Sequence, residues 1–208
     1  VLFNPLRQRV QGWIDRIFFR GRYEYRERLR DLSSRLASLL SPPQIREMLL
    51  DAVSRSLQVE KVTLVLAEGG DYRLYSLGRP QAGEAASPEL AFSISLAGRK
   101  GSPLGRAAAG GWCGDDREGE TLRALFEALE AVLLVPLPSH DVNPGLIALG
   151  QKRSGELFVD EDVELLTTIA NQAATAIENA QSYEALQALN RELEQRVAAR
   201  TAALREAL

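Results

Sequence analysis

Cys113 is the only thiol and His140 the only imidazole in the 208-residue sequence, so any chemistry that needs either group rests on one residue. A metal site needs several histidine, cysteine or carboxylate ligands together, and neither residue belongs to a cluster of that kind. The acidic runs Asp115–Asp116 and Asp160–Asp162 each precede a predicted helix, where negative charge stabilises the N-terminus. No glycine-rich phosphate-binding loop is present. The sequence therefore predicts no metal site and no catalytic residues, and we expect no enzyme activity from this fragment.

The composition is that of a soluble globular protein, with 45% hydrophobic and 25% charged residues. A net charge of -3 gives no general signal for nucleic acid, and we expect no nucleic-acid partner. One cysteine cannot form an intrachain disulfide, so a reducing compartment is expected. No apolar run reaches about 18 residues, the length that a membrane-spanning helix needs. The sequence starts without methionine, which favours a piece of a longer protein.

The N-terminal segment is strongly basic. Eight arginines and three acids lie between Arg7 and Arg30, interleaved with aromatic residues such as Trp13 and Tyr23. A solvated helix face would explain the charge. Basic residues also collect on the cytoplasmic side of membrane proteins, just after a span, and aromatic residues suit the membrane surface. RNA binding uses similar residue types, but no stacking motif accompanies them here. We expect residues 1–41 to form an entry helix near a membrane surface.

Two predicted helices open the chain. Apolar residues recur at spacings of three and four from about Pro5 to Leu40. Ser41 then has the position of an N-cap, with Pro42 first in the next helix and Gln44 completing a capping box. The apolar face of this second helix continues to Leu57. These patterns predict two consecutive helices with a break at residue 41.

A sheet is predicted after the second helix, because the hydrophobic pattern changes period. Val62–Leu66 is β-branched and compact, and 72–77 alternates after the turn Glu68–Asp71. Ala91–Leu96 also alternates and is predicted as a strand. Leu122, Leu125, Phe126 and Leu129 indicate a helix, and two apolar strands are predicted at 132–137 and 145–150.

From Asp160 to the end the sequence predicts one unbroken helix, because no glycine or proline follows Gly155. Its later part carries a stripe at steps of three, four, four, three, four and four, formed by Leu186, Leu189, Leu193, Val197, Arg200, Leu204 and Leu208. This eleven-residue repeat predicts a nearly straight pair of helices. A parallel homodimer through this stripe is expected, with Arg200 weakening it; a single solvated helix with Arg–Glu pairs is the alternative.

The strongest local pattern in the C-terminal third comprises Leu149–Glu156, Phe158, Asp160–Asp162, Leu165–Leu166, Ile169–Ala170, Gln172–Ala173 and Ala176–Ala180. This pattern resembles the GAF domains that precede histidine kinase cores. Val135–Leu137 resembles the family's penultimate strand. Leu193–Thr201 resembles the helical linker into a kinase dimerisation helix, and Asn4–Tyr25 is similar to segments that follow multi-span membrane regions.

The resemblance implies an α+β fold, a GAF-like antiparallel sheet of about five or six strands flanked by helices. It implies a sensor domain at 42–180 and a coiled-coil signalling helix at 181–208. We expect the sensory input region of a membrane-associated histidine kinase, cytoplasmic and tethered to the inner membrane, with the kinase core beyond Leu208. The alternatives are a structural dimerisation and relay module without a ligand, or an input domain for another output such as a cyclase or phosphatase.

The family binds varied ligands, so the resemblance names no cofactor. We expect a small-molecule pocket near the variable segment 99–116, lined by Phe92, Ile94, Leu104, Trp112, Phe126 and Val135. Taken one residue at a time, core packing explains each of them better than ligand contact does. Bilin attachment is not expected, because Trp112 and Gly114 flank Cys113 instead of the family's His or Phe. Haem is not expected from His140, which lies in a predicted turn. Nor does His140 have the helical context of a kinase phosphoacceptor.

Overall fold

The computed structural model describes residues 41–77, 79–106, 116–138 and 145–206. The described elements are, in chain order, α2 (Pro42–Leu57), β1 (Val62–Glu68), β2 (Asp71–Ser76), β3 (Arg79–Ala85), α3 (Pro88–Arg99), β4 (Leu104–Gly105), α5 (Asp116–Ala128), β5 (Leu133–Leu137), β6 (Gly145–Leu149) and α6 (Asp160–Glu206). The helix predicted before residue 41 lies outside the described residues.

The six described strands form one antiparallel sheet in the order β3-β2-β1-β6-β5-β4. Central strands β1 and β6 pair Leu64 with Ile147 and Val65 with Leu146. Their side chains are buried on both faces, because helices cover the sheet from both sides. Gly145 is needed at the start of β6, since a Cβ there would lie 2.6 Å from the carbonyl oxygen of Val65. The α+β fold class expected from the sequence is confirmed.

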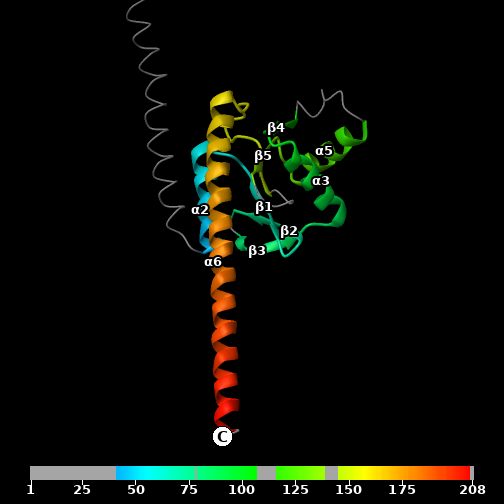
Figure 1. Cartoon of the computed structure of the whole chain (residues 1–208). Helices are drawn as coiled ribbons and strands as arrows, with labels where there is room; N and C mark the ends of the chain where they lie inside the picture. The colour runs from blue at the N-terminus through cyan, green and yellow to red at the C-terminus, as the bar shows by residue number, and fades with distance from the viewer. Residues whose placement is uncertain (1–40, 78, 107–115, 139–144, 207–208) are drawn as a thin grey trace, which may run out of the picture. The chain divides into compact units, whose positions relative to one another are not determined.

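Two helix pairs cover the two faces (Figure 1). On one face α2 packs against β1 and β3, α6 packs against β5, and the two helices contact each other. On the other face α3 and α5 contact each other and enclose an apolar cluster with the sheet. Segments from both ends of the described chain therefore share one sheet face.

Helix α2 starts where the sequence predicts. Ser41 occupies the N-cap position with extended backbone, and Pro42 follows in the first turn. The side chain of Ser41 accepts no capping hydrogen bond, so the predicted capping box does not form. The helix ends at Leu57, and its C-cap Gln58 adopts a left-handed conformation with φ of 49°.

The predicted strand at Ala91–Leu96 is wrong, because these residues belong to α3. The Ser87 side chain accepts a hydrogen bond from the backbone N–H of Leu90 and caps the helix, and Pro88 occupies its first turn. Ile94 and Ala97 are buried at helical spacing, whereas Phe92 is 68% exposed. The alternation of three apolar residues is typical of a strand, but the N-cap Ser87 and Pro88 in the first turn specify a helix here.

Hydrogen bonds and an ion pair connect the start of α6 to the segment that follows β6. The backbone N–H of Val159 donates to Asp162 Oδ2 at 2.9 Å, one half of a capping box. Lys152 Nζ also contacts this oxygen at 2.5 Å, with both side chains mostly buried. Lys152 lies 5.3 Å from the centre of the Phe158 ring. These contacts fix the helix start relative to β6.

Candidate functional site

The six residues predicted to line a pocket do not gather in one place. Ile94, Leu104 and Phe126 share the apolar cluster between the sheet and the α3–α5 pair. Val135 is buried on the opposite sheet face, because Leu134 and its neighbours in register face the cluster. Phe92 points into solvent, and Trp112 lies outside the described residues. A single pocket lined by all six is therefore not what the structure assembles.

An open cavity of about 750 Å³ does lie on the α3 side of the sheet. Strands β1 to β3 line it with residues such as Thr63, Leu74 and Glu84, and Ser87 and Leu90 contribute from the start of α3. Thr63 is only 3% exposed, so its hydroxyl gives the cavity a buried polar group. The sequence did not predict this cavity because β3 (RPQAGEA) has no alternating apolar pattern.

Tyr72 adds a second buried hydroxyl on this face. Its Oη is enclosed and makes no hydrogen bond of good geometry among the residues that the structure describes. Burial raises the pKa of this hydroxyl, and the interaction with the Ser95 side chain and the positive charge of Arg99 reduce the shift.

A polar cluster lies on the other sheet face, made of Arg46 from α2, Glu68 from β1, and Arg73 and Tyr75 from β2. Arg46 Nη1 contacts Glu68 Oε1 at 3.1 Å, and its guanidinium stacks 4.2 Å from the Tyr75 ring centre. Tyr75 Oη donates to Glu68 Oε2 at 2.7 Å. Gly83 makes room for the ring, since a Cβ there would lie 2.7–2.9 Å from its outer atoms.

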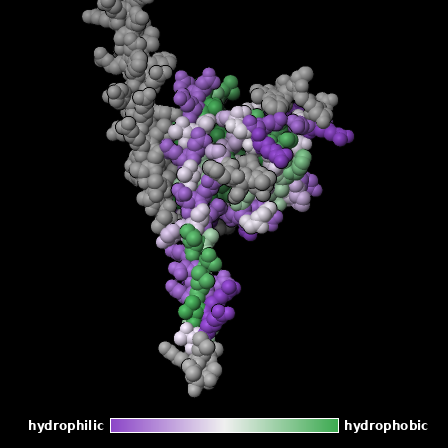
Figure 2. Space-filling view, viewed as in Figure 1, coloured by the Kyte–Doolittle hydropathy of each residue, from purple (hydrophilic) through white to green (hydrophobic). Residues whose placement is uncertain are grey.

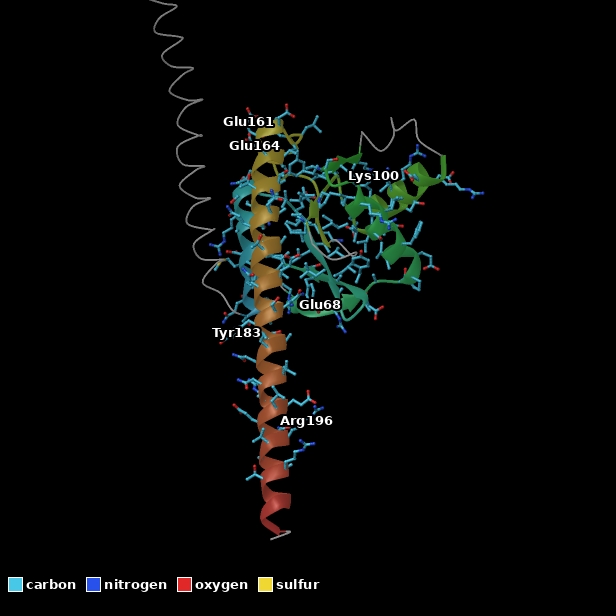
Figure 3. The ribbon with its side chains drawn as sticks, in the orientation of Figure 1. Glu68, Lys100, Glu161, Glu164, Tyr183 and Arg196 are labelled. Atoms are coloured by element: carbon cyan, nitrogen blue, oxygen red, sulfur yellow. The ribbon has the colours of Figure 1, made fainter. Side chains whose placement is uncertain are left out.

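This cluster borders the point where α6 leaves the domain. Glu68 and Arg46 line a groove together with Gln181, Glu184 and Ala185 of α6. Figure 3 shows Glu68 beside α6, at about the level of Tyr183. The same groove reaches Pro42 and Pro43, at the start of α2. The sequence pattern places Glu68 only in a turn. The one local signal of the cluster is Arg46, a charged residue beside the apolar positions Ile45 and Leu49.

Tyr75 makes folding stability sensitive to high pH. Burial, and then the hydrogen bond to Glu68 and its negative charge, raise the pKa of Tyr75 from 10.0 to about 12. The folded state therefore holds this proton more tightly than the unfolded state, and the resulting stability is lost as pH rises from about 10 to 12. Urea unfolding across this range should show the loss in the wild type and a smaller one in Tyr75→Phe. Parallel curves for the two proteins would contradict the assignment.

The second half of α6 carries the predicted stripe on an exposed helix. All residues from Gln181 to Thr201 are exposed, and Leu186, Leu189, Leu193 and Val197 are 65%, 52%, 49% and 64% exposed. We call these four residues the distal stripe; Figure 2 shows it as a hydrophobic band on the helix. Arg200 is exposed as well, and the side chain of Leu204 lies outside the described part.

Within the described residues, no group of three or more histidine, cysteine or acidic side chains could hold a metal ion. No helix among them combines the length and the hydrophobicity of a bilayer-crossing helix. Cys113 and His140 lie outside the described ranges.

Known structures share this fold at low sequence identity. A methyl-accepting chemotaxis protein matches with a TM-score of 0.56 and 17% identity, over 74% of this chain and 99% of that one. The GAF domain of a phosphoenolpyruvate-protein phosphotransferase from Coxiella burnetii matches with a TM-score of 0.54 and 17% identity, over 77% and 96%. The corresponding Acinetobacter domain gives 0.51 and 17%, over 75% and 93%. At this identity these likenesses establish the fold alone.

The family of this chain is assigned by a match to a family model. No curated protein matches the sequence. The family model described as "GAF domain" matches residues 41–179, which extend from the N-cap of α2 well into α6. The chain therefore belongs to the GAF domain family of sensory and signalling domains.

Proposed function

We propose that this chain is the sensory input region of a histidine kinase and that α6 carries its signal to a downstream kinase core. The observation that carries the proposal is the continuity of α6, a single helix of 47 residues. Its first half is buried against the sheet through residues such as Leu166, Ile169 and Ala173, and its second half is exposed. A continuous helix that packs on the domain at one end and projects from it at the other can transmit a movement of the domain to whatever follows.

The kinase assignment rests on the resemblance of Leu193–Thr201 to the linker that enters a kinase dimerisation helix. The fragment itself is not a catalyst in this proposal. The proposal also includes the basic segment between Arg7 and Arg30, which would contact the cytoplasmic face of the inner membrane. This part of the proposal is based on the sequence only.

The polar cluster supports relay because of its position. Glu68 connects α2 and the β1–β2 hairpin through Arg46 and Tyr75, and the groove it lines reaches Glu184 on the exit helix. A movement of the β1–β2 hairpin would therefore be transmitted to α6 at the point where this helix leaves the domain. A ligand shifts such a system only by binding one arrangement better than another.

A fusion experiment tests the relay. The 208-residue chain is joined in frame to a histidine kinase core that lacks its own input, and autophosphorylation is measured. Inserting two helical residues at the junction turns the core by roughly 200°, whereas inserting eleven turns it by only about 20°. We expect the two-residue insertion to change kinase activity strongly and the eleven-residue insertion to leave it near the parent fusion.

Equal kinase activity in all three fusions would contradict relay through the phase of α6. The unfused 208-residue chain serves as the negative control, and we expect no phosphate transfer from ATP to it. Phosphorylation of that chain on its own would contradict the non-catalytic assignment.

A relay module without a ligand is the second candidate, and the apolar cluster favours it. Phe126, Ile94 and Leu125 are fully buried in that cluster, so this part of the presumed sensor is already filled by the protein. The cavity bounded by Thr63 and Ser76 favours a ligand instead. Native mass spectrometry of freshly purified protein separates the two: a small molecule released on denaturation supports a sensor, and the bare chain mass supports a relay.

A further inference from the structure

Helix α2 packs against the first half of α6 and runs in the opposite direction. The start of α2 borders a groove of about 850 Å³, which Gln181 and Glu184 line where α6 leaves the domain. The end of α2 lies next to the segment that leads into α6. Figure 3 marks the two ends of the packed part of α6 with Glu161 and Tyr183. The contacts at these two ends differ in kind.

A network of backbone and side-chain contacts joins the end of α2 to the start of α6. Gln58, the C-cap of α2, accepts a hydrogen bond of 2.8 Å from the backbone N–H of Arg153. The neighbouring Lys152 contacts Asp162 Oδ2 through its Nζ, and the same oxygen accepts the backbone N–H of Val159. The side chains of Lys152 and Asp162 are only 12% and 17% exposed, so salt screens this ion pair little. The two helices are therefore held together at this end through Lys152.

The packing of α6 on its own domain weakens along the helix. Its first turns bury the large side chains of Leu166 and Ile169, at 0% and 1% exposure. The buried residues that follow are all alanines except for Ile177: Ala170, Ala173, Ala174, Ala176 and Ala180. A methyl group makes fewer contacts than a branched side chain, so it resists small shifts between packed elements less. The start of α6 is therefore held more firmly than its exit end.

The groove end has no comparable network. Arg46 of α2 is 7% exposed and pairs with Glu68 of the β1–β2 hairpin. Among the residues that the structure describes, no hydrogen bond or ion pair holds the side chain of Gln181 or Glu184. The hairpin turn Gly69–Gly70 has open space beside it, because a Cβ at either glycine would meet no atom within 4 Å. The groove therefore leaves room for α6 to approach the hairpin or move away from it.

We propose that α6 tilts as a lever about its first turn, with Lys152 as a positioning residue at the pivot and the groove as the gap that opens and closes. Glu184 lies 22 residues after Asp162, which is about 33 Å along the helix at roughly 1.5 Å per residue. A tilt of roughly 10° moves the exit end by about 6 Å and the pivot end hardly at all. As a way to carry a signal, the lever rests on the proposed function.

Distances between pairs of spin labels in the full 208-residue chain test the lever. Cys113 is first replaced by serine. Cysteines for labelling are then introduced in pairs, at Gln44 and Glu184 for the groove end and at Ser56 and Glu161 for the pivot end. All four positions are exposed, so the labels disturb no buried contact. Labelled chain is mixed into an excess of unlabelled chain, so that each distance is measured within one copy.

We expect the 44–184 distances to spread at least about twice as widely as the 56–161 distances, because movement grows with distance from the pivot. Lys152→Met keeps an apolar stem but removes the ion pair, and should broaden the 56–161 distances to a similar spread. Lys100→Met is the matched control, since it removes a lysine that is 21% exposed and pairs with Glu118 on α5. It should leave the distances at both ends unchanged.

Equally narrow distances at the two ends would overturn the lever. So would unchanged 56–161 distances in a Lys152→Met protein that circular dichroism shows to be folded. If Lys152→Met does not fold, the comparison of the two label pairs in the wild-type background still decides. None of these measurements involves a kinase. A rigid groove end would leave the kinase fusions to decide the proposed function, whereas fusions of equal activity would contradict the proposed function and leave a measured lever standing.

Discussion

Replacing Phe126 by alanine is expected to lower the free energy of unfolding by about 3–5 kcal/mol. Phe126 is fully buried in the cluster that joins α3 and α5 to the sheet, so its loss removes apolar contacts and leaves a cavity. Stability is measured by urea unfolding followed by circular dichroism. Such a loss is a large fraction of the stability of an ordinary domain.

Phe92 provides the matched control for this substitution. It is the same residue type on the neighbouring helix α3, it was predicted to line the same pocket, and it is 68% exposed. We expect Phe92→Ala to change the free energy of unfolding by no more than about 0.5 kcal/mol, as surface substitutions usually do. Similar losses for the two variants would show that the packing around Phe126 or the orientation of α3 differs from the structure.

The contrast between these two phenylalanines shows where sequence reasoning failed. Phe92, Ile94 and Leu96 alternate with polar residues, which predicts a strand, but Leu90, Ile94 and Ala97 share a helical face that turns inward. A six-residue window fits both periods. Ser87 and Pro88 resolve the ambiguity, because together they form a helix start, and the sequence prediction gave them no weight.

The long exit helix and the central strands were predictable for a physical reason. Strands β1, β5 and β6 are buried on both faces, and such strands appear as short apolar runs between turn residues. Helix α6 has no interior glycine or proline, and acids fill its first turn. In both cases the local sequence preference agrees with the tertiary environment.

The functional region was less predictable because it depends on sheet pairing. Whether Val135 and Leu104 share a face follows from the β4–β5 register, in which Leu104 pairs with Leu134. A shift of one residue would have reversed the answer. The cluster of Arg46, Glu68 and Tyr75 likewise joins three elements, and apart from the charge of Arg46 beside apolar positions no local pattern indicates it.

The double substitution Leu189→Glu with Leu193→Glu is expected to weaken self-association by roughly a hundredfold or more, about 3 kcal/mol. In the parallel pair that the sequence pattern predicts, the change would bring four carboxylates into an apolar contact. Burying unpaired like charges is strongly unfavourable. Light scattering and sedimentation across a micromolar concentration series should show a dimer for the wild type and a monomer for the variant.

The control for this change carries the same added charge on the opposite side of the helix. Ala188 and Gln195 lie roughly 140° and 160° from Leu193 by helical phase, and both are exposed. Ala188→Glu with Gln195→Glu should therefore remain dimeric, with circular dichroism confirming equal helix content in both variants. If the control dissociates as readily as the stripe variant, total charge rather than the distal stripe governs association. If both remain dimeric, the copies are held together by a surface other than this face of α6, because two glutamates on the stripe cannot be accommodated in a close apolar helix pair.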